Sequence, residues 1–593
     1  MSTPQARGGR AFAADPVVEM PGELPRHWVT QLVSCVVDEN VGLPDAAVLT
    51  YRDPDHELLA ATGVTLGTRL KVSVVTAQGN AREQLFSGEV TAVELDSDTT
   101  GSFTVVRALS RLHRLQRGRK VVAYRNMTTA AIVRKVAAGA GLAVGRVEAA
   151  RVTHKQLSQA NVSDWEFLQQ LAGESGAQVR MDDKERLEFV RPERAASAPA
   201  PSTPATSSPL VLQYGRNLLA LRAALTGSEG AARVEVRGWN VETKRPLTAR
   251  QPSVRSDTVR PGMNPSEASR VFGATARTTV ADTPYRTQAE AAAVADSLAD
   301  AVSSGFGEVE AVAEGDPRLR AGRAVALGNV GADFSGRYTA TAARHVLEPH
   351  GGYRTTVSVS ATPDRSLAGL TAGAAAPARG PRMPGLAIGV VTDIREAAGG
   401  QRGWVRLTFP WLDDAYVTDW VRTVQWGGKG GGGVFSPEVN DEVLVGFEQG
   451  LLDHPYVLGG LYNGVDKPSP HEVPLVDRTS GKVNRRSLVS RKGHRLELLD
   501  TPRGVSGVRL ASGDKRLTVT LDERRGEIAL NVSDRSGARS LSSLTLSQSG
   551  ITLDAGTGEV RVKGRAVTVD GTSRLSLDGG LLATLKAKLI RLN

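Results

Sequence analysis

The residues of this 593-residue chain that could do chemistry are a glycine-rich loop with a lysine, an aspartate pair and two neighbouring histidines. The loop Trp426–Gly433 places Lys429 among glycines, as phosphate-binding loops do. Such a loop requires Gly-Lys followed by Ser or Thr, whose hydroxyl binds magnesium. Here Gly430 follows Lys429, and Val434-Phe-Ser-Pro437 follows the loop where a helix would be needed. The loop is therefore interpreted as a flexible β-hairpin loop.

The acidic pair and the histidines fit catalysis no better. Asp413 and Asp414 could flank a glycosidic bond, but they follow Pro410-Trp411, where a solvated turn is expected. His345 and His350 flank a short segment, but a hydrolytic zinc site needs three protein ligands and a base. The sequence has no HExxH and no Gly-x-Ser-x-Gly motif. We therefore predict no catalytic residue, no metal ligand and no cofactor.

Composition excludes further classes of protein. A single cysteine, Cys35, excludes intrachain disulfides and a Cys-based zinc site. No apolar run reaches about 18 residues, so no membrane span is expected, and the N-terminus lacks the apolar core of a signal peptide. The chain has 63 Gly but only 11 Phe, 9 Tyr and 7 Trp, which excludes a coiled-coil rod and favours many strand turns.

Net charge is +10, and basic residues are densest over Arg107–Arg125, where seven Lys or Arg occur without an acidic residue. One interpretation is a nucleic-acid patch. The other is a solvated strand or loop that faces an acidic neighbouring subunit. We favour the second, and predict no nucleic-acid partner, because nucleic-acid sites add stacking aromatics and only Tyr124 is close by.

Two low-complexity segments rich in Pro, Ala, Ser or Gly divide the chain, and their composition favours loops or linkers over a packed core. A softer break follows Asn463-Gly464. The predicted division is 1–193, a linker at 194–209, 210–365, a linker at 366–385, 386–464, a connector at 465–483, and 484–593.

The first two parts predict mainly strands with a few helices. Ser163 and Glu166 form a capping box before helical spacing that ends near Gly176. Thr287 and Glu290 open a second capped helix, to about Ser304, and a further helix is expected over 128–138. The segment Leu85–Leu95 is expected to form strand, turn and strand. The part 386–464 predicts five short strands in a small closed barrel, because closure removes exposed edges.

The last part shows apolar residues at i and i+2 between glycine turns, which predicts a repeating β ladder. No aromatic residue occurs from Ala511 to Asn593, so small branched side chains must fill a narrow axis. Such strands cannot bury a face alone and must stack on their neighbours or on identical chains. An elongated β prism is therefore expected. The pairs are Leu517/Val519, Ile528/Leu530, Leu544/Leu546, Ile551/Leu553, Val560/Val562, Val567/Val569 and Leu575/Leu577.

With these elements in order, the chain resembles the VgrG-like spike proteins of contractile injection systems: type VI secretion, extracellular contractile particles and phage hub–spike proteins. The segment Gly403–Trp411, GWVRLTFPW, is similar to the barrel strand of that family, with Trp404 where Arg is usual. Asp453–Asn463 follows as the family's next barrel motif, and Ser490–Leu498 resembles the start of its stalk. Val236–Asn240 is similar to a strand of the hub.

The resemblance implies a homotrimer that is mainly β. Residues 1–365 would form a hub of two similar barrels per chain, 386–464 an oligonucleotide/oligosaccharide-binding (OB) barrel, and the remainder an intertwined stalk. Implied partners are the inner tube, baseplate proteins, a metal-bearing PAAR tip protein, transiently the target membrane and, in some members, an effector cargo. The tip protein would bind at Leu589, Ile590, Arg591, Leu592 and Asn593.

The implied role is mechanical rather than enzymatic, within a phage tail-like particle assembled in the cytoplasm, and extracellular release stays open. Only about 20 residues separate barrel from stalk, too few for a lysozyme domain. Three alternatives remain. The chain could serve a phage tail; it could be a β-helical polysaccharide-degrading enzyme; or its barrel could bind nucleic acid through Trp404, Phe409 and Trp411, which we instead place in the barrel core.

Overall fold

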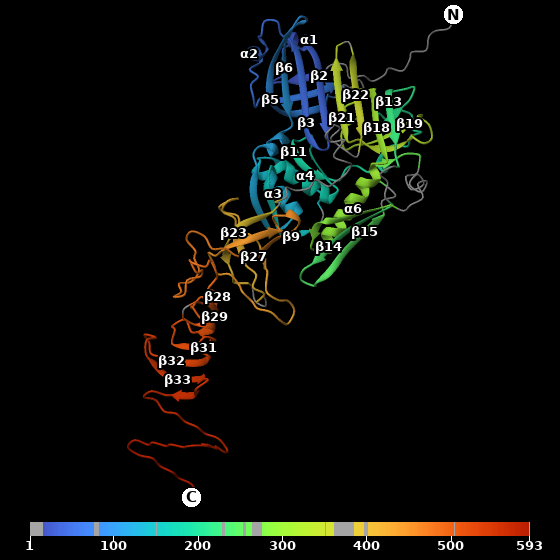
Figure 1. Cartoon of the computed structure of the whole chain (residues 1–593). Helices are drawn as coiled ribbons and strands as arrows, with labels where there is room; N and C mark the ends of the chain where they lie inside the picture. The colour runs from blue at the N-terminus through green and yellow to red at the C-terminus, as the bar shows by residue number, and fades with distance from the viewer. Residues whose placement is uncertain are drawn as a thin grey trace, which may run out of the picture. The chain divides into compact units, whose positions relative to one another are not determined.

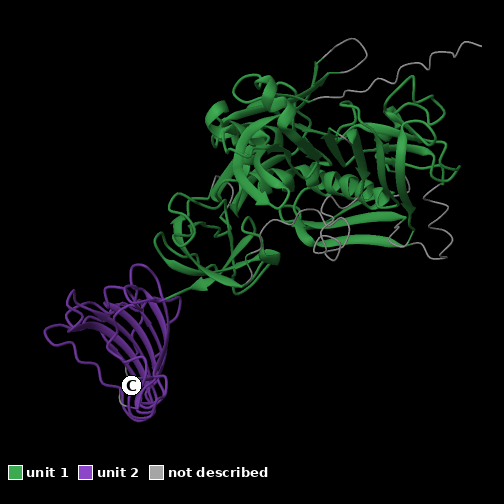
Figure 2. Cartoon of the chain, turned by 90° about the horizontal axis from the view of Figure 1, so that it is seen from above, with its two compact units in different colours: residues 1–461 green, residues 462–593 purple. Residues whose placement is uncertain are grey.

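The computed structural model describes residues 16–75, 82–149, 151–227, 232–252, 256–263, 276–349, 351–360, 383, 385–396, 401–502 and 504–591. The chain divides into two compact units, residues 1–461 and 462–593, coloured green and purple in Figure 2. Strands dominate both units, and the fold is the mainly β one expected (Figure 1). The predicted linker 366–385 lies outside the described residues except at 383 and 385.

The largest sheet of the first unit joins the two predicted hub parts. Strand pairing continues across them because β2 pairs antiparallel with β21, from Cys35↔Leu347 to Asn40↔Ala342. The two parts on either side of the predicted linker 194–209 therefore share one hydrogen-bonded sheet. The ten strands, in sheet order, are β1 (Pro16–Glu19), β4 (Arg69–Val75), β5 (Arg82–Asp98), β6 (Gly101–Leu109), β3 (Leu43–Arg52), β2 (Leu32–Asn40), β21 (Ala342–Glu348), β22 (Gly352–Val359), β18 (Gly307–Glu314) and β13 (Leu218–Leu225).

The expected turn within Leu85–Leu95 was wrong, because β5 is one continuous strand of 17 residues. Gly88 lies inside it, facing the neighbouring strand β6. A Cβ at Gly88 would meet the carbonyl oxygen of Leu109 at 2.2 Å. The glycine therefore permits a close approach between two strands, and does not mark a turn.

The predicted capped helix is α4 (Asp164–Ser175), and both its boundaries are confirmed. The Ser163 hydroxyl accepts from the Glu166 amide at 3.1 Å, and the Glu166 carboxylate accepts from the Ser163 amide at 2.8 Å. Gly176 ends the helix with a φ of 61°, which a side chain rarely adopts. The helix packs with α3 (Thr129–Gly139), the ribbon β7 (Lys120–Thr128) and β9 (Thr153–Val162), and the sheet β10 (Gln178–Met181), β11 (Arg186–Val190) and β8 (Ala143–Val147).

The second predicted capping box opens α6 (Gln288–Ser304), which packs on a three-stranded sheet. The sheet is β15 (Arg245–Pro252), β14 (Arg233–Asn240) and β17 (Arg277–Tyr285), and a four-stranded sheet is β12 (Val211–Gln213), β19 (Ala324–Gly328), β20 (Gly336–Thr339) and β16 (Val259–Arg260). The short helices are α1 (Arg26–Gln31), α2 (Leu58–Thr62), and the 3₁₀ turns η1 (Arg111–Gln116), η2 (Ala195–Ser197) and η3 (Glu448–Gly450). None of the helices within the described residues is both long and apolar enough to cross a membrane.

The predicted linker 194–209 is packed, which corrects the expectation that its composition prevents a core. Ala198 is buried against Val211, Ala324 and Ala326. The Arg337 guanidinium also donates to the Pro199 carbonyl at 3.2 Å. Alanine side chains are small enough to sit directly on the β12–β19 sheet, so low complexity here reflects close packing.

Residues 386–461 form the closed barrel that was predicted. Five strands pair in the order β24 (Arg406–Thr408), β23 (Leu386–Asp393), β26 (Glu442–Phe447), β27 (Pro455–Gly460) and β25 (Arg422–Thr423). The outer strands then meet, because Val405 and Val421 exchange backbone hydrogen bonds of 3.0 and 2.7 Å. Phe409, Val405 and Leu407 fill the interior and are fully buried.

The second unit is an antiparallel meander of seven strands hydrogen-bonded within one chain, where a ladder between chains had been expected. The strands run in chain order: β28 (Arg485–Val489), β29 (Arg495–Asp500), β30 (Ser506–Ala511), β31 (Leu517–Asp522), β32 (Glu527–Ser533), β33 (Ser540–Ser547) and β34 (Gly550–Asp554). The four apolar pairs predicted between 517 and 553 lie on these strands. The pairs Val560/Val562, Val567/Val569 and Leu575/Leu577 lie outside any strand of the described chain.

His345 is fully buried in the ten-stranded sheet and makes the first unit sensitive to acid. Its Nδ1 lies 2.8 Å from the Tyr353 hydroxyl and 3.1 Å from that of Thr355. Burial, with nearby Arg320, lowers the pKa of His345 to about 3. The folded chain therefore keeps this ring neutral between about pH 6.5 and pH 3, whereas the unfolded chain protonates it below about pH 6.5.

We expect the stability that His345 contributes to be complete above about pH 6.5 and to fall with acidification. The loss should be about 2 kcal/mol between about pH 6.5 and pH 5. Urea unfolding of the first unit, followed by tryptophan fluorescence at several pH values, measures it. His345→Gln should flatten the slope, whereas the exposed His56→Gln should retain it. An unchanged slope in His345→Gln would contradict the assignment.

Candidate functional site

The seven-stranded sheet of the second unit has one face made mainly of aliphatic side chains, with polar residues such as Arg486 and Ser542 at its margins. Directly opposite residues of antiparallel strands share a face, and the register pairs Leu496 with Leu510, Leu510 with Val519, and Val519 with Leu530. We call this surface the stalk face. It consists of Leu488, Leu496, Leu498, Val508, Leu510, Leu517, Val519, Leu521, Ile528, Leu530, Val532, Leu544, Leu546, Ile551 and Leu553.

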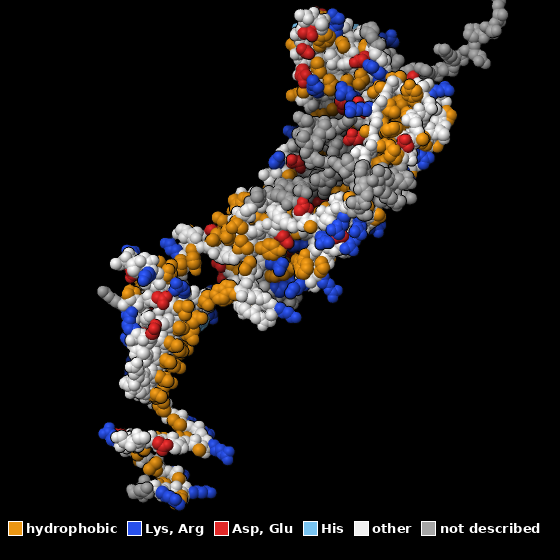
Figure 3. All heavy atoms as spheres, turned by 45° about the vertical axis from the view of Figure 1, so that its right-hand side comes forward, with side chains coloured by type: hydrophobic (Ala, Val, Ile, Leu, Met, Phe, Trp, Pro, Cys, Tyr) orange, Lys and Arg blue, Asp and Glu red, His pale blue; other side chains and the backbone are white. Residues whose placement is uncertain are grey.

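Nothing in the described chain covers the stalk face. Twelve of its 15 side chains are exposed, from 36% at Leu488 to 74% at Ile551. Figure 3 shows hydrophobic side chains as a continuous stripe along this sheet. Soluble monomers rarely expose contiguous apolar patches larger than a few hundred Å². The stalk face is therefore a surface that a partner must cover.

The predicted connector, residues 465–483, contacts the opposite face of the same sheet. The buried Glu497 carboxylate accepts from the Arg509 Nε at 2.8 Å and lies 2.7 Å from the His471 Nε2. Arg509 also contacts Glu472 at 2.5 Å. The connector therefore packs on the polar face at β29 and β30.

From residue 555 to residue 591 the described chain forms neither helix nor strand. All its residues from Glu559 to Arg591 are exposed. Of the five residues predicted to bind a tip protein, Leu589 and Ile590 are 68% and 49% exposed, and Arg591 is exposed. Leu592 and Asn593 lie outside the described residues. Tip binding by this end stays a prediction.

The barrel is fixed to the β7–β9 ribbon of the hub by polar contacts and packing. The Ser158 amide donates to the Asp453 carboxylate at 2.8 Å, and the Ser158 hydroxyl donates to its second oxygen. Gln156 donates to the Tyr416 hydroxyl at 3.2 Å. Ala160 of β9 is buried in the barrel core. The ribbon thus covers part of the barrel and holds it within the first unit.

We expect Asp453→Ala to loosen the barrel from the ribbon, because the Ser158 amide and hydroxyl lose their acceptor. The cost should be about 1–3 kcal/mol. Hydrogen exchange of the amides in β9, residues 153–162, should accelerate accordingly. Asp414→Ala, in an exposed turn of the same barrel, is the matched control and should leave β9 protected. Equal exchange in both variants would contradict this role.

The glycine-rich loop has no phosphate site geometry. Trp426 and Phe435 pair across it with ring centroids 4.5 Å apart. The Gln425 carboxamide accepts from the Phe435 amide at 2.8 Å, which closes the loop onto itself. The predicted β-hairpin was wrong, because the strands on either side of the loop, β25 and β26, are not neighbours in the sheet: β25 pairs with β27, and β26 lies between β23 and β27.

The aromatics assigned to the barrel core separate into two groups, which corrects that interpretation in part. Phe409 is fully buried, but Trp411 is 51% exposed. The Arg402 guanidinium lies 3.6 Å above the Trp404 ring, on the outside of the barrel. Alternation explains Trp404, since Val405, Leu407 and Phe409 point inward whereas Trp404 and Arg406 point outward. It does not explain Trp411, which lies with Pro410 in the turn after β24.

Five of the seven basic residues in the stretch Arg107–Arg125 form ion pairs with acidic residues of the same chain. Arg114 and His113 contact Glu89 at 2.5 and 3.0 Å, and Lys120 contacts Asp164 at 2.6 Å. Burial acts to raise the pKa of Glu89, but the hydrogen bonds from Arg114 and His113 hold it below its usual value. The stretch thus offers little free charge to a nucleic acid.

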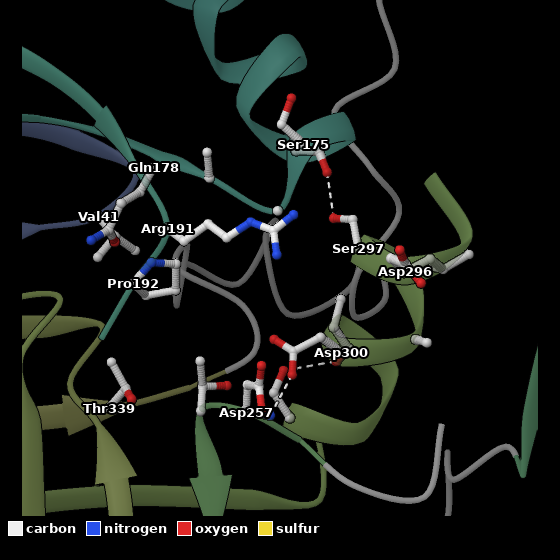
Figure 4. Close-up of a pocket in the computed structure, with 18 of the residues that line it drawn as sticks. Val41, Ser175, Gln178, Arg191, Pro192, Asp257, Asp296, Ser297, Asp300 and Thr339 are labelled. Atoms are coloured by element: carbon white, nitrogen blue, oxygen red, sulfur yellow. Dashed lines mark hydrogen bonds between the residues drawn. The ribbon is translucent and has the colours of Figure 1, made fainter. Parts of the chain in front are cut away.

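A cavity of about 730 Å³ lies in the hub between α6, the end of α4 and the start of β16 (Figure 4). The Arg191 guanidinium points into it. Burial raises the pKa of Asp300, whose carboxylate accepts from the Asp257 amide at 2.6 Å. Ser297 donates to the Gly173 carbonyl at 2.5 Å and has no adjacent base. Ser297 is therefore not activated as a nucleophile by a base.

Metal binding has no visible site either. Within the described ranges, no group of three His, Cys, Asp or Glu side chains could hold an ion. His345 is used in the core, and His350 lies outside the described residues. Asp413, of the predicted acidic pair, accepts from the Ala415 amide at 2.8 Å, as in a solvated turn.

Two family models match the chain. Residues 387–462 match the type VI secretion system/phage-baseplate injector OB domain, and residues 61–348 match the Alg8 N-terminal domain. The first range coincides with the closed barrel.

Among curated proteins, the chain is similar to spike proteins of the type VI secretion system from Pseudomonas aeruginosa. It is 42% identical to VgrG5 over 79 residues, 12% of this chain and 10% of the relative, and 37% identical to VgrG4b over 101 residues, 16% and 12%. The matches thus cover only about a tenth of the length of these two relatives.

Solved structures with similar backbones include a chain of the Francisella PdpA–VgrG complex. The match covers 92% of this chain and 88% of that chain, at 9% identity and a TM-score of 0.49. A type VI secretion component of E. coli covers 73% of this chain and 96% of its own, at 15% identity and a TM-score of 0.45. The match to a 43 kDa prophage tail protein of Shewanella oneidensis covers 58% of this chain and 97% of that protein, at 14% identity and a TM-score of 0.42.

Proposed function

We propose that this VgrG-like chain forms the homotrimeric hub and central spike of a contractile injection system. The injector OB domain supports the class of machine, and the uncovered stalk face carries the proposal. Three copies would bury their stalk faces against one another around a narrow axis, which aliphatic side chains without aromatics can fill. Each buried Leu or Ile would contribute about 1.5–3 kcal/mol.

In this proposal the spike acts mechanically and makes or breaks no covalent bond. The hub would meet the inner tube and baseplate, and the C-terminal end would bear a tip protein such as a PAAR protein. Contraction would drive the stalk through the target membrane. An effector carried by hub or stalk belongs to the same proposal, as does assembly in the cytoplasm within a phage tail-like particle.

The test is the molar mass of the full-length protein. Light scattering on a size-exclusion column at micromolar concentration should give three times the 62.7 kDa chain mass. A monomer at that concentration would sink the proposal. Electron micrographs of the purified trimer should show a globular head with one thin rod.

The enzymatic alternative has its own measurement. A polysaccharide-degrading β-helix needs aromatics along its ladder, and the chain has none after Tyr462. Incubation of the trimer with peptidoglycan and acidic polysaccharides should release no soluble fragments.

A further inference from the structure

The positive charge of this chain is concentrated in the stalk. Residues 484–593 hold 20 of the 73 Lys and Arg but only 11 of the 63 Asp and Glu, and so carry +9 of the net +10. The remaining 483 residues are almost neutral, and five of the seven cations in the basic stretch of the hub are paired with acids. Any electrostatic preference of the protein for an anionic partner therefore resides in the stalk.

The free charge increases toward the C-terminal end. After Asp578 there is no acidic residue, whereas Lys586, Lys588 and Arg591 follow. Among the described residues from 555 to 591, Arg561 alone has an ion-pair partner, Glu559 at 3.3 Å. These basic side chains are all exposed.

Alternation would keep this charge on the outside of an assembled stalk. Arg561 alternates with Val560 and Val562, and Lys586 and Lys588 alternate with aliphatic residues. Side chains at i and i+1 of an extended strand point to opposite faces. If the aliphatic residues turn toward the axis, the basic residues face the surroundings.

We propose that the stalk end, residues 555–591, binds the phosphate headgroups of an anionic phospholipid bilayer. This rests on the proposed function, in which copies of the chain cover the alternating aliphatic pairs. Leu581 and Leu582 lie outside that alternation and are fully exposed beside the basic residues. A surface that combines amines with exposed leucines suits the headgroup region, where both groups find partners.

The same observations disfavour a nucleic acid as the partner. Binding of single strands combines a basic groove with aromatic stacking platforms. The stalk has no aromatic residue after Tyr462, so it cannot stack bases. Lipid phosphates require neither stacking nor a groove, and their binding weakens as salt screens the charges.

Cosedimentation of the full-length protein with vesicles tests the proposal. The protein should bind phosphatidylcholine vesicles with about 30% phosphatidylglycerol at least tenfold more tightly than pure phosphatidylcholine vesicles. Binding should be lost when the salt concentration rises from about 50 mM to about 500 mM. The triple variant Lys586→Gln/Lys588→Gln/Arg591→Gln should bind the anionic vesicles at least tenfold more weakly.

The matched control neutralises three exposed cations of the hub, as Arg117→Gln/Lys184→Gln/Arg216→Gln, and should bind like the unmodified protein. A trimer that ignores anionic vesicles, or whose binding survives the stalk substitutions, overturns the inference and leaves the proposed function intact. If the stalk substitutions abolish binding to a single-stranded oligonucleotide but leave vesicle binding unchanged, the inference is overturned in favour of a nucleic acid. A monomeric mass overturns the proposed function and this inference together.

Discussion

The double variant Leu510→Asp/Leu530→Asp should be a monomer at concentrations where the unmodified chain is a trimer. Both side chains lie near the centre of the stalk face, on either side of Val519. Association would bury two carboxylates per chain, six per trimer, without partners. Burying an unpaired carboxylate costs several kcal/mol, which exceeds the 1.5–3 kcal/mol that each leucine contributes.

The matched control for this variant uses the opposite face of the same sheet. Thr520→Asp and Asn531→Asp introduce the same charges on β31 and β32, where Thr520 follows Val519 and Asn531 follows Leu530 in the alternation. Light scattering should give a trimer for the control and a monomer for the stalk-face variant. Circular dichroism should show the same strand content in both, because the ladder lies within one chain. Trimers from both variants would refute the stalk face as the interface.

Arg320→Ala should destabilise the first unit by about 3–5 kcal/mol, the cost of breaking a buried ion pair. Arg320 lies in the loop between β18 and β19, and its guanidinium reaches across to the first part of the hub. It donates to the Leu85 carbonyl at 2.7 Å and contacts the Glu39 carboxylate and the Gln84 carbonyl. The Glu39 side chain is 7% exposed, so removal of Arg320 leaves a buried carboxylate unpaired.

Arg318→Ala, two residues earlier, is the control for this substitution. Arg318 contacts Asp316 at 2.8 Å, but its side chain is 43% exposed. Exposed pairs contribute about 0–1 kcal/mol. Urea unfolding should therefore separate the two variants by at least about 2 kcal/mol. Burial raises the pKa of Glu39 against the pull of Arg320, so Glu39→Gln should recover part of the loss in Arg320→Ala. Equal stability of both arginine variants would contradict the contact.

Local signals in the sequence were sufficient to predict the capped helices, the barrel and the stalk strands between residues 517 and 553. The capping box of Ser163 and Glu166 involves residues close in the chain, as does the i, i+2 alternation of aliphatic residues. The spacing of these residues in the sequence is therefore enough to predict both. Gly88 was misread because a glycine in a strand and a glycine in a turn look the same until the partner strand is known. The packing of Ala198 on Ala324 and Ala326 likewise depends on residues more than 100 positions away.

The stalk face could be predicted as a surface, but its hydrogen bonding could not. Alternation specifies which side chains share a face and says nothing about whether the neighbouring strand belongs to the same chain. In the structure β28–β34 pair within one chain, so each copy offers a preformed sheet. The contact between Arg320 and Glu39 also left no sequence signal, because 281 residues separate the two partners.

The absence of aromatic residues beyond Tyr462 gives the two units different optical properties. All seven tryptophans, the last of them Trp426, belong to the first unit. Intrinsic tryptophan emission therefore reports melting of the hub and barrel alone, whereas the stalk contributes to far-ultraviolet dichroism without absorbing near 280 nm. Two melting curves recorded on one sample would therefore separate the unfolding of the hub and barrel from that of the stalk.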